Sequence, residues 1–294
     1  MNLKIKNTEY DNIKKLYLNG LSSPKIAKQY NVNEITICKI LKKCNVKPHG
    51  EKPRKYFFNF DFFEKIDTEE KAYFLGLMYS DGCNYKVKSL CSIALAEEDK
   101  DILDQFIKSI QYTGKCKLSR KKRKKHHSDL YGLSLHSKKT CLDLEKNGCM
   151  PRKSLILKFP KNDIVPSFLI KHFLRGFFDG DGSIHINKKE KRLTIYFTSS
   201  LFFCEDLIKF LKNKFNFESS LRHYSYSKAK SVRICGTRKN IFFLDWLYSN
   251  CEIKMQRKYK QFCDFCRFYL ENNNNLNNSR GSNLDVSKIA LRYF

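Results

Sequence analysis

The hydrophobic pattern of the chain repeats itself in its main body. Two apolar helical segments, Ala72–Gly82 (AYFLGLMYSDG) and His172–Gly182 (HFLRGFFDGDG), each end in Asp-Gly. After each of them, apolar and polar residues alternate as in a pair of β-strands, and an amphipathic helix follows. The apolar residues of that helix recur at helical spacing in both copies: Ile102, Leu103, Phe106, Ile107 and Ile110, then Leu207, Phe210, Leu211 and Phe215. A basic hairpin and a last helical run complete each copy.

This repeat predicts an α+β fold, a pseudo-two-fold pair of α-β-β-α-β-β-α units that pack as a pseudo-dimer within a monomer. We expect the first unit over residues 61–160 and the second over residues 161–270. A small all-α domain is expected over residues 1–50, with a linker over residues 51–60. Residues 271–294 begin with an Asn-rich run of almost no apolar content, which predicts a disordered tail. Its last ten residues, DVSKIALRYF, could form a short helix or strand.

The amino-terminal domain has three helical stretches within residues 9–45. Asn31-Val32-Asn33 makes a tight turn before the third stretch, and Asn33 is a favoured helix cap. The pattern is similar to a resolvase-type helix-turn-helix, whose third helix enters the major groove of DNA. A protein-binding three-helix module is the alternative. We expect DNA to contact the exposed residues of the third helix: Glu34, Thr36, Lys39 and Lys43.

The charge of the chain narrows its possible partners. Lys and Arg number 57 against 30 Asp and Glu, a formal net charge of +27. Such an excess attracts polyanions, so we expect double-stranded DNA, with an anionic membrane surface as the alternative. No apolar run is long enough to span a bilayer and the start of the chain lacks a signal peptide, which disfavours a membrane partner. Twelve cysteines without a secretion signal suit a reducing, intracellular compartment.

The two repeated helices predict a pair of facing carboxylates. Small residues stand four apart on each helix: Gly76 and Ser80, then Gly176 and Gly180. Such stripes allow close helix packing, which would bring Asp81 and Asp181 together at the helix ends. Two carboxylates beside two negative helix termini need a divalent cation or a proton, and oxygen ligands suit Mg²⁺. The arrangement predicts metal-assisted hydrolysis of a phosphodiester. Alternatively, Asp-Gly merely ends a core helix.

A calcium-binding loop is a second alternative for the second motif. The oxygen-bearing residues Asp179, Asp181, Ser183, Asn187 and Glu190 match ligand positions of an EF-hand loop. However, Ile184 stands where that loop requires Gly, and the following residues alternate as a strand. The pattern therefore disfavours a calcium loop.

The segments FLGLMYSDG and LRGFFDGDG resemble the two motifs of the LAGLIDADG homing endonucleases in their single-chain form. The resemblance implies eight strands in two saddle-shaped sheets, with Asp81 and Asp181 as catalytic acids that bind Mg²⁺, or Mn²⁺, and no small-molecule cofactor. It implies auxiliary metal ligation by the backbone carbonyls of Ser80 and Gly180. Basic residues near the reacting phosphate would be Lys153 and Lys258. The first motif departs from the family pattern at Phe74, Met78 and Tyr79, which affects packing symmetry and leaves the acid in place.

In this fold the outward faces of the sheets would hold DNA, with a solvated face as the alternative. Side chains expected to reach base edges are Ser134, His136, Ser183, His185, Asn187, Thr194, Tyr196, Thr198 and Arg233. Phosphate contacts are expected from the two basic hairpins: Lys121, Lys122, Arg123 and Lys124, then Arg222, Tyr224, Lys228 and Lys230. The sequence thus predicts a site-specific double-strand DNA endonuclease of homing type. The alternative is a non-cleaving DNA or RNA binder on the same fold, a transcription regulator or an intron maturase.

Overall fold

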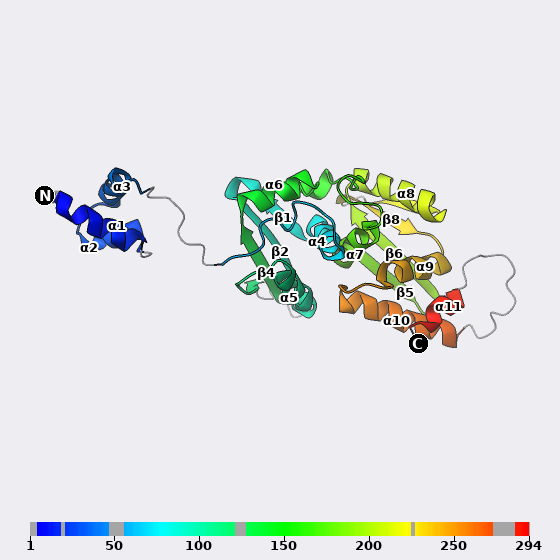
Figure 1. The fold of residues 1–294 in the computed structure, drawn as a ribbon. Coiled ribbons are helices and arrows are strands. Elements are labelled where there is room, and N and C mark those ends of the chain that lie inside the picture. Colours follow the sequence, from blue (N-terminus) through cyan, green and yellow to red (C-terminus); the bar gives the residue numbers. More distant parts are fainter. Residues whose placement is uncertain are drawn as a thin grey trace. The chain divides into compact units, whose positions relative to one another are not determined.

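The computed structural model describes residues 5–18, 21–46, 56–120, 128–224, 227–272 and 286–293. The chain forms two compact units, Met1–Phe57 and Phe58–Phe294. All the strands that the structure describes lie in the second unit, and Figure 1 labels most of its elements.

The first unit consists of three short helices around a small core. They are α1 (Tyr10–Leu18), α2 (Ser23–Gln29) and α3 (Glu34–Lys43), after a 3-10 turn at Asn7–Glu9. Asn33 caps α3, because its side chain accepts a 2.9 Å hydrogen bond from the Ile35 amide. Apolar residues from all three helices fill the core: Ile13, Ile26, Ile37 and Leu41. Amphipathic helices this short gain most of their stability from such packing.

The second unit contains the same element order twice. The first series is α4 (Glu69–Ser80), β1 (Gly82–Tyr85), β2 (Leu90–Ala96), α5 (Lys100–Ser109), β3 (Lys117–Arg120), β4 (Leu130–His136) and α6 (Lys138–Lys146). The second is α7 (Ile170–Asp181), β5 (Gly182–Asn187), β6 (Arg192–Ser199), α8 (Leu201–Phe215), β7 (Ser219–Tyr224), β8 (Ser227–Ile234) and α9 (Thr237–Tyr248). The predicted α+β fold with paired α-β-β-α-β-β-α units is confirmed. Residues 182–187 form strand β5, so the segment that matched a calcium loop is not a loop.

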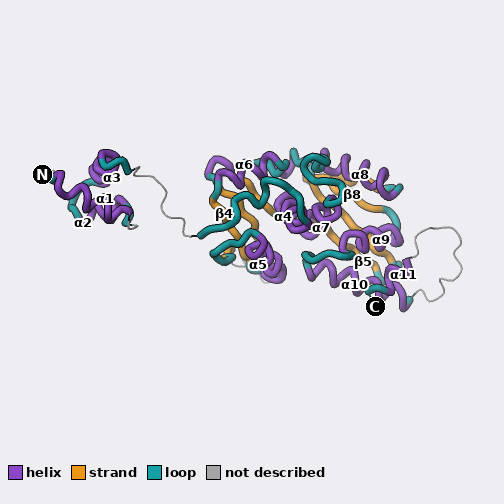
Figure 2. Tube along the Cα trace, in the orientation of Figure 1, coloured by secondary structure: helices purple, strands orange, loops and turns teal. Residues whose placement is uncertain are grey.

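Each half builds one four-stranded antiparallel sheet. The strand orders are β1-β2-β4-β3 and β5-β6-β8-β7, so the two sheets have the same topology. Helices α5 and α6 pack on one face of the first sheet, and α8 and α9 pack on one face of the second. Figure 2 shows these helices overlying the strands. The alternation predicted for β6 is present, because Leu193, Ile195 and Phe197 are buried in the core.

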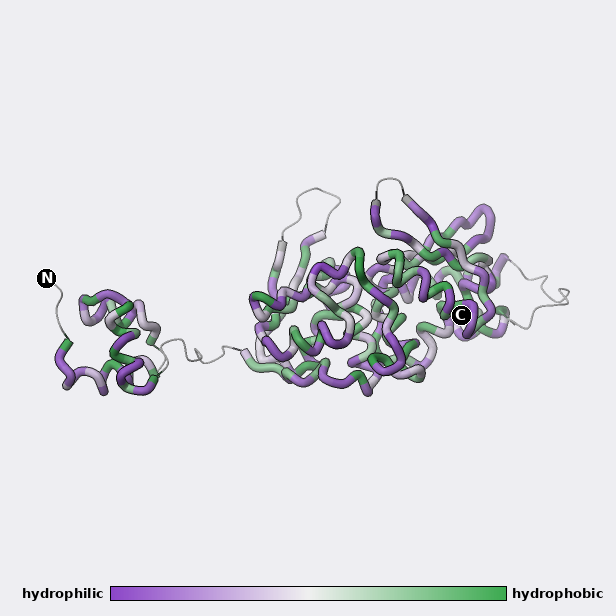
Figure 3. The backbone as a smooth tube through the Cα atoms, turned by 90° about the horizontal axis from the view of Figure 1, so that it is seen from above, coloured by the Kyte–Doolittle hydropathy of each residue, from purple (hydrophilic) through white to green (hydrophobic). Residues whose placement is uncertain are grey.

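Helices α4 and α7 lie side by side between the two sheets (Figure 1). Their backbones touch because glycines stand at the crossing. A Cβ on Gly76 would lie 2.0 Å from the Phe173 carbonyl oxygen, and one on Gly176 would lie 1.9 Å from that of Tyr73. Helix α4 is buried from Ala72 to Tyr79, as a helix packed on all sides must be. Elsewhere hydrophobic and hydrophilic residues alternate along the elements (Figure 3).

The carboxyl-terminal segment corrects one expectation from the sequence. Helix α10 (Gln256–Glu271) precedes α11 (Val286–Leu291), and α11 packs on α9 and α10. Val286, Ile289 and Ala290 are buried, and the Tyr293 hydroxyl donates to Asp245 Oδ1 at 2.8 Å. The prediction of a disordered tail over 271–294 is therefore wrong for residues 286–293, and residues 273–285 lie outside the described ranges. None of the described helices is both long and apolar enough to cross a membrane.

Candidate active site

The two motif carboxylates stand at the ends of the paired helices. Asp81 caps the end of α4, and Asp181 is the last residue of α7. A Cβ on Gly180 would lie 2.4 Å from Asp81 Oδ2 and 1.9 Å from Ser80 Oγ, so the second motif closely approaches the first. Both residues keep exposed surface, although the neighbouring protein encloses much of each carboxylate. Because the ends of the two helices approach each other this closely, position 180 must be occupied by a small residue.

The surroundings of the two carboxylates disfavour their ionised forms. Burial by the neighbouring protein raises the pKa of Asp81, and the charge of Asp181 raises it further, to about 6. Burial also raises the pKa of Asp181, while Lys153 and Lys258 oppose that increase. A raised carboxyl pKa means that a cation at this place would compete with a proton for the same oxygens.

A lysine reaches the end of each paired helix. Lys258 of α10 is 4% exposed. Its Nζ donates to the carbonyl oxygens of Phe178 at 2.7 Å, Asp179 at 2.7 Å, Gly180 at 3.1 Å and Gly182 at 2.6 Å. The last carbonyls of a helix are short of amide donors, so the ammonium helps to satisfy the negative end of α7, where the Gly182 amide also donates to Phe178 O. Burial lowers the pKa of Lys258 to about 8.

The lysine of the first half is held more loosely. Lys153 Nζ donates to the Ser80 carbonyl oxygen at the end of α4, at 2.8 Å. Arg152, just before it, has a positive φ of 55°, which turns the chain back toward α4. The structure thus brings Asp81, Asp181, Lys153 and Lys258 to the same two helix ends, with unequal numbers of contacts.

The carbonyls expected as auxiliary metal ligands already accept hydrogen bonds. Ser80 O accepts from Lys153, and Gly180 O accepts from Lys258. Across the described residues, no group of three or more His, Cys, Asp or Glu side chains gathers as a metal site. The two carboxylates fit Mg²⁺ as hard oxygen donors, and the remaining ligands would have to be water or substrate oxygens. Such a partly filled shell is typical of Mg²⁺ sites that act on phosphates.

Asp179 is a buried carboxylate that the sequence did not single out for this role. It is 1% exposed and accepts hydrogen bonds from Tyr73 Oη at 2.8 Å, Tyr248 Oη at 2.7 Å and the Met255 amide at 2.8 Å. Burial raises its pKa, and these hydrogen bonds oppose the increase. Since Met255 is the residue just before α10, Asp179 fixes the start of the helix that carries Lys258. The sequence signal that could have identified Asp179 is an acidic residue within an otherwise apolar helical segment.

Arg175 is a second buried charge inside the paired helices. Its side chain is fully buried, and Nη2 donates to Glu69 Oε1 at 2.7 Å, at the start of α4. Its Nε donates to the Ile253 carbonyl at 2.7 Å, and the guanidinium lies 5.3 Å from the Tyr73 ring centroid. Arg175 thereby joins α7 to α4 and to the segment before α10. The signal in the sequence was the arginine within LRGFFDGDG.

The residues expected to read bases differ in their exposure. Ser134, His136, His185 and Asn187 are exposed, whereas Ser183, Tyr196, Thr198 and Arg233 are half-buried. Thr194 is 8% exposed, so only its edge is available. All of these lie on the sheet faces away from the packed helices, at positions that alternate with buried apolar residues.

The residues expected to bind phosphate are only partly described. Arg222 is exposed on β7 and lies opposite Ser231 of β8. Lys228 is exposed and Lys230 half-buried, but they share the parity of the buried Val232, so they do not point with Arg233. Outside the described residues are Lys121, Lys122, Arg123 and Lys124, together with the side chain of Tyr224. On α3 of the first unit, Glu34, Lys39 and Lys43 are exposed and Thr36 is half-buried.

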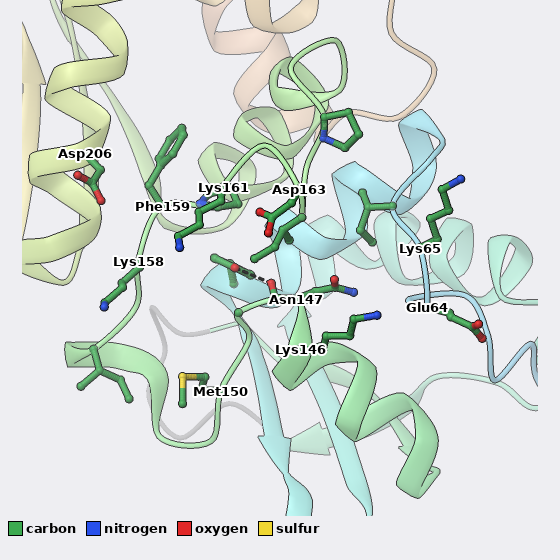
Figure 4. Close-up of a pocket in the computed structure, with 17 residues that line it drawn as sticks. Glu64, Lys65, Lys146, Asn147, Met150, Lys158, Phe159, Lys161, Asp163 and Asp206 are labelled. Atoms are coloured by element: carbon green, nitrogen blue, oxygen red, sulfur yellow. Dashed lines mark hydrogen bonds between the residues drawn. The ribbon is translucent and has the colours of Figure 1, made fainter.

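A cavity of about 630 Å³ lies beside the connection between the two halves. Figure 4 shows basic and acidic side chains around it, among them Lys65, Lys146, Lys158, Lys161, Asp163 and Asp206. The Tyr79 hydroxyl donates to the Asn147 carbonyl in its wall, at 2.6 Å. Neither Asp81 nor Asp181 lines this cavity, so it is separate from the paired helix ends.

Comparisons with known proteins find one family model over part of the chain and solved structures of low sequence identity. Residues 169–245 match the family model of the LAGLIDADG-like domain. A solved structure of the homing endonuclease I-WcaI bound to its DNA recognition sequence matches with a TM-score of 0.51 and 18% identity, over 67% of this chain and 90% of that chain. The LAGLIDADG meganuclease I-AabMI bound to uncleaved DNA matches at 15% identity and a TM-score of 0.47, over 76% of this chain and 98% of that one. A search of curated proteins finds no match.

Proposed function

We propose that this chain, which carries a LAGLIDADG-like domain and shares the fold of a DNA-bound homing endonuclease, is a site-specific double-strand DNA endonuclease. The observation that carries the proposal is the meeting of two motif ends, where Gly180 closely approaches the Asp81 carboxylate. One chain supplies both halves, so it acts as a monomer with the geometry of a dimer. Each half would hydrolyse one phosphodiester of the duplex.

Asp81 and Asp181 would hold Mg²⁺, with Mn²⁺ as an alternative ion. When bound, the metal stabilises the attacking and leaving oxygens of the phosphodiester. The raised pKa of Asp81 supports this role, because a group that resists ionisation beside a second carboxylate gains most from a cation. The exposed surface that both residues keep leaves room for a backbone phosphate to approach.

Lys153 and Lys258 would place positive charge beside the reacting phosphate. Each ammonium is already held at a helix end by carbonyl oxygens, so little reorganisation is needed when negative charge develops. Burial lowers the pKa of Lys258 to about 8, so the ammonium is mostly protonated at neutral pH and its charge can stabilise a negative phosphate nearby. Asp179 would act as a positioning residue, because it anchors the start of α10.

The outer faces of the two sheets would bind duplex DNA, and the first unit would add contacts through α3. The strong positive charge supports a polyanion as the partner. Exposed Lys39 and Lys43 on α3 support a second DNA contact. A three-helix unit of this kind also suits protein binding, so its role has to be tested separately.

The test begins with a library of random-sequence duplexes, from which the full chain selects binders in EDTA. The selected duplexes are then placed in a plasmid and incubated with protein in Mg²⁺. Linear plasmid, cut at the selected site, is the expected product. Tight, salt-sensitive binding without a nick in either strand would refute the endonuclease and favour a non-cleaving DNA binder on the same fold. The same selection with a chain that carries Lys39→Ala and Lys43→Ala tests the first unit, and an unchanged binding profile would exclude it from recognition.

A further inference from the structure

We propose that the second sheet reads base sequence over several adjacent rows, whereas the first sheet reads bases at fewer rows. The inference rests on the proposed function, since it takes the outer sheet faces as the DNA surface. It deepens that function by naming the form of the target: a duplex whose two halves differ in how strictly their sequence is constrained.

The outer face of the second sheet is rich in hydrogen-bonding side chains. Every second residue of its central strand β6 faces outward: Arg192, Thr194, Tyr196 and Thr198. The register places Tyr196 between Ser183 of β5 and Arg233 of β8, and Arg233 lies opposite Ser220 of β7. Donors and acceptors therefore continue across all four strands. Direct readout of base edges requires such hydrogen-bond donors and acceptors.

These side chains also hold one another in place. The His185 and Tyr196 rings meet edge to face, with centroids 5.2 Å apart. The Arg222 guanidinium lies 5.6 Å from the Tyr196 centroid, and Thr198 Oγ1 lies 2.8 Å from Ser231 Oγ. Such mutual contacts restrict rotamers before DNA arrives, which favours discrimination between bases.

Arg233 provides an independent sign that a ligand is missing from this face. Its Nε is buried and has no hydrogen-bond partner within the described part of the chain. A buried donor without a partner is unfavourable, so an acceptor from outside the chain would be bound in compensation. Guanine O6 and N7 are the acceptors that arginine most often reads in the major groove.

The outer face of the first sheet has a different chemistry. The outward residues of its central strand β2 are Leu90, Ser92, Ala94 and Ala96. Ser92 takes the place of Tyr196, because Ile93 pairs with Gly82 as Phe197 pairs with Gly182. The outward residues of the paired strand β4 are Leu130, Gly132, Ser134 and His136. Alanine and leucine can touch a thymine methyl but cannot exchange hydrogen bonds with a base edge. Long polar side chains on these inner strands and on β1 are confined to the row that contains Tyr85 and His136, and the outer strand β3 adds the exposed Lys117 opposite Gly132.

The unequal faces predict an unequal target. The half of the duplex under the second sheet should tolerate few substitutions at several adjacent base pairs. The half under the first sheet should tolerate more of them, because long hydrogen-bonding side chains face it at fewer rows. Affinity for the tolerant half would come mainly from phosphate contacts, which carry no sequence information.

The test uses the full chain, the random duplex library and binding in EDTA, so that cleavage is not required. Wild-type protein is compared with Arg222→Ala, Arg233→Ala and the conservative Arg233→Lys, and with Ser92→Ala and Ser119→Ala as matched variants on the first sheet. For each protein the preference for every base is determined at every position of the selected sequence. Circular dichroism and thermal unfolding verify that each variant folds.

We expect each arginine variant to reduce base preference about tenfold or more at one to three adjacent positions, as the loss of a good base contact does. Arg233→Lys should keep affinity and lose the preference, because lysine lacks the planar fork. The serine variants should leave every preference within about twofold. If they flatten as many positions as the arginine variants, or if Arg233→Ala weakens all sequences equally, the inference is overturned while the endonuclease stands. Binding without any base preference would overturn it as well, and the plasmid assay would then decide the function separately.

Discussion

The crossing of α4 and α7 gives the sharpest stability prediction, which is the effect of Gly176→Ala. The added Cβ would lie 1.9 Å from the Tyr73 carbonyl oxygen, 2.8 Å from its carbon and 3.1 Å from the Leu77 amide. All three atoms belong to a helix backbone, so no side chain can rotate away. Moving the Tyr73 oxygen out to the 3.0 Å that real Cβ contacts respect requires the helices to separate by 3.0 − 1.9 = 1.1 Å.

A separation of this size loosens the whole interface between the two halves. Overpacking of a core typically costs between about 1 and 3 kcal/mol, and rigid backbone neighbours place this variant at about 3 kcal/mol or above. The matched control is Gly132→Ala on β4, where the nearest atom is Ser119 Cβ at 3.1 Å. We expect that control to change stability by less than about 1 kcal/mol.

The assay is urea unfolding followed by the fluorescence of Trp246, the single tryptophan of the chain. Its ring packs against Phe215 and Phe243 in the second unit, with centroids 5.0 and 5.4 Å away, so it reports on that unit alone. If Gly176→Ala unfolds at the same urea concentration as wild type, the close helix crossing is refuted. A large loss of stability in Gly132→Ala would equally refute the reasoning, because destabilisation would then not depend on contact with rigid backbone atoms.

Three further changes test the charges around the site. Asp179→Asn should lower the free energy of unfolding by about 2 kcal/mol, because the Met255 amide and two tyrosines lose a charged acceptor; urea unfolding measures this, and an unchanged midpoint would contradict it. Glu69→Gln should lower the free energy of unfolding by about 2 kcal/mol, because it leaves Arg175 without its counter-charge. The loss should stay below that of a fully buried ion pair, since Glu69 is partly exposed. An equally stable variant would mean that Arg175 needs no anion. Cleavage in Mg²⁺ should fall as the pH drops below about 6, where Asp81 becomes protonated. The pKa of Asp81 is higher in the folded state than in the unfolded state. The Asp81 carboxyl should therefore stabilise the metal-free protein most below about pH 4, and this stabilisation should be lost as the pH rises to 6. An Asp81→Asn chain lacks that contribution and is the control.

The sequence was sufficient for the repeat and for the order of its elements. Both follow from local patterns: the alternation of Leu193, Ile195 and Phe197 on a strand, and the glycines of the paired helices. These patterns are visible because a sheet buries every second residue and a close helix crossing excludes side chains. The same logic placed Asp81 and Asp181 at adjoining helix ends.

Contacts between distant segments were beyond such patterns. Asp179 takes its partners from α4, α9 and the residue before α10, and nothing local to its helix specifies them. The four carbonyl contacts of Lys258 depend likewise on how α10 docks against α7. The six residues of helix α11 carry too short an apolar pattern to separate helix from strand, and the burial of the helix depends on α9 and α10.

The central claim, that Asp81 and Asp181 together hold the metal that cuts DNA, is tested most directly by single-carboxylate variants. Plasmid carrying a selected duplex is incubated in Mg²⁺ with wild-type protein, Asp81→Asn or Asp181→Asn, and binding to the same duplex is measured in EDTA. The account predicts Mg²⁺-dependent linearisation by wild type alone, with all three proteins binding the duplex with similar affinity. Cleavage by either variant at the level of the wild-type protein would contradict the account, as would cleavage by the wild-type protein in EDTA.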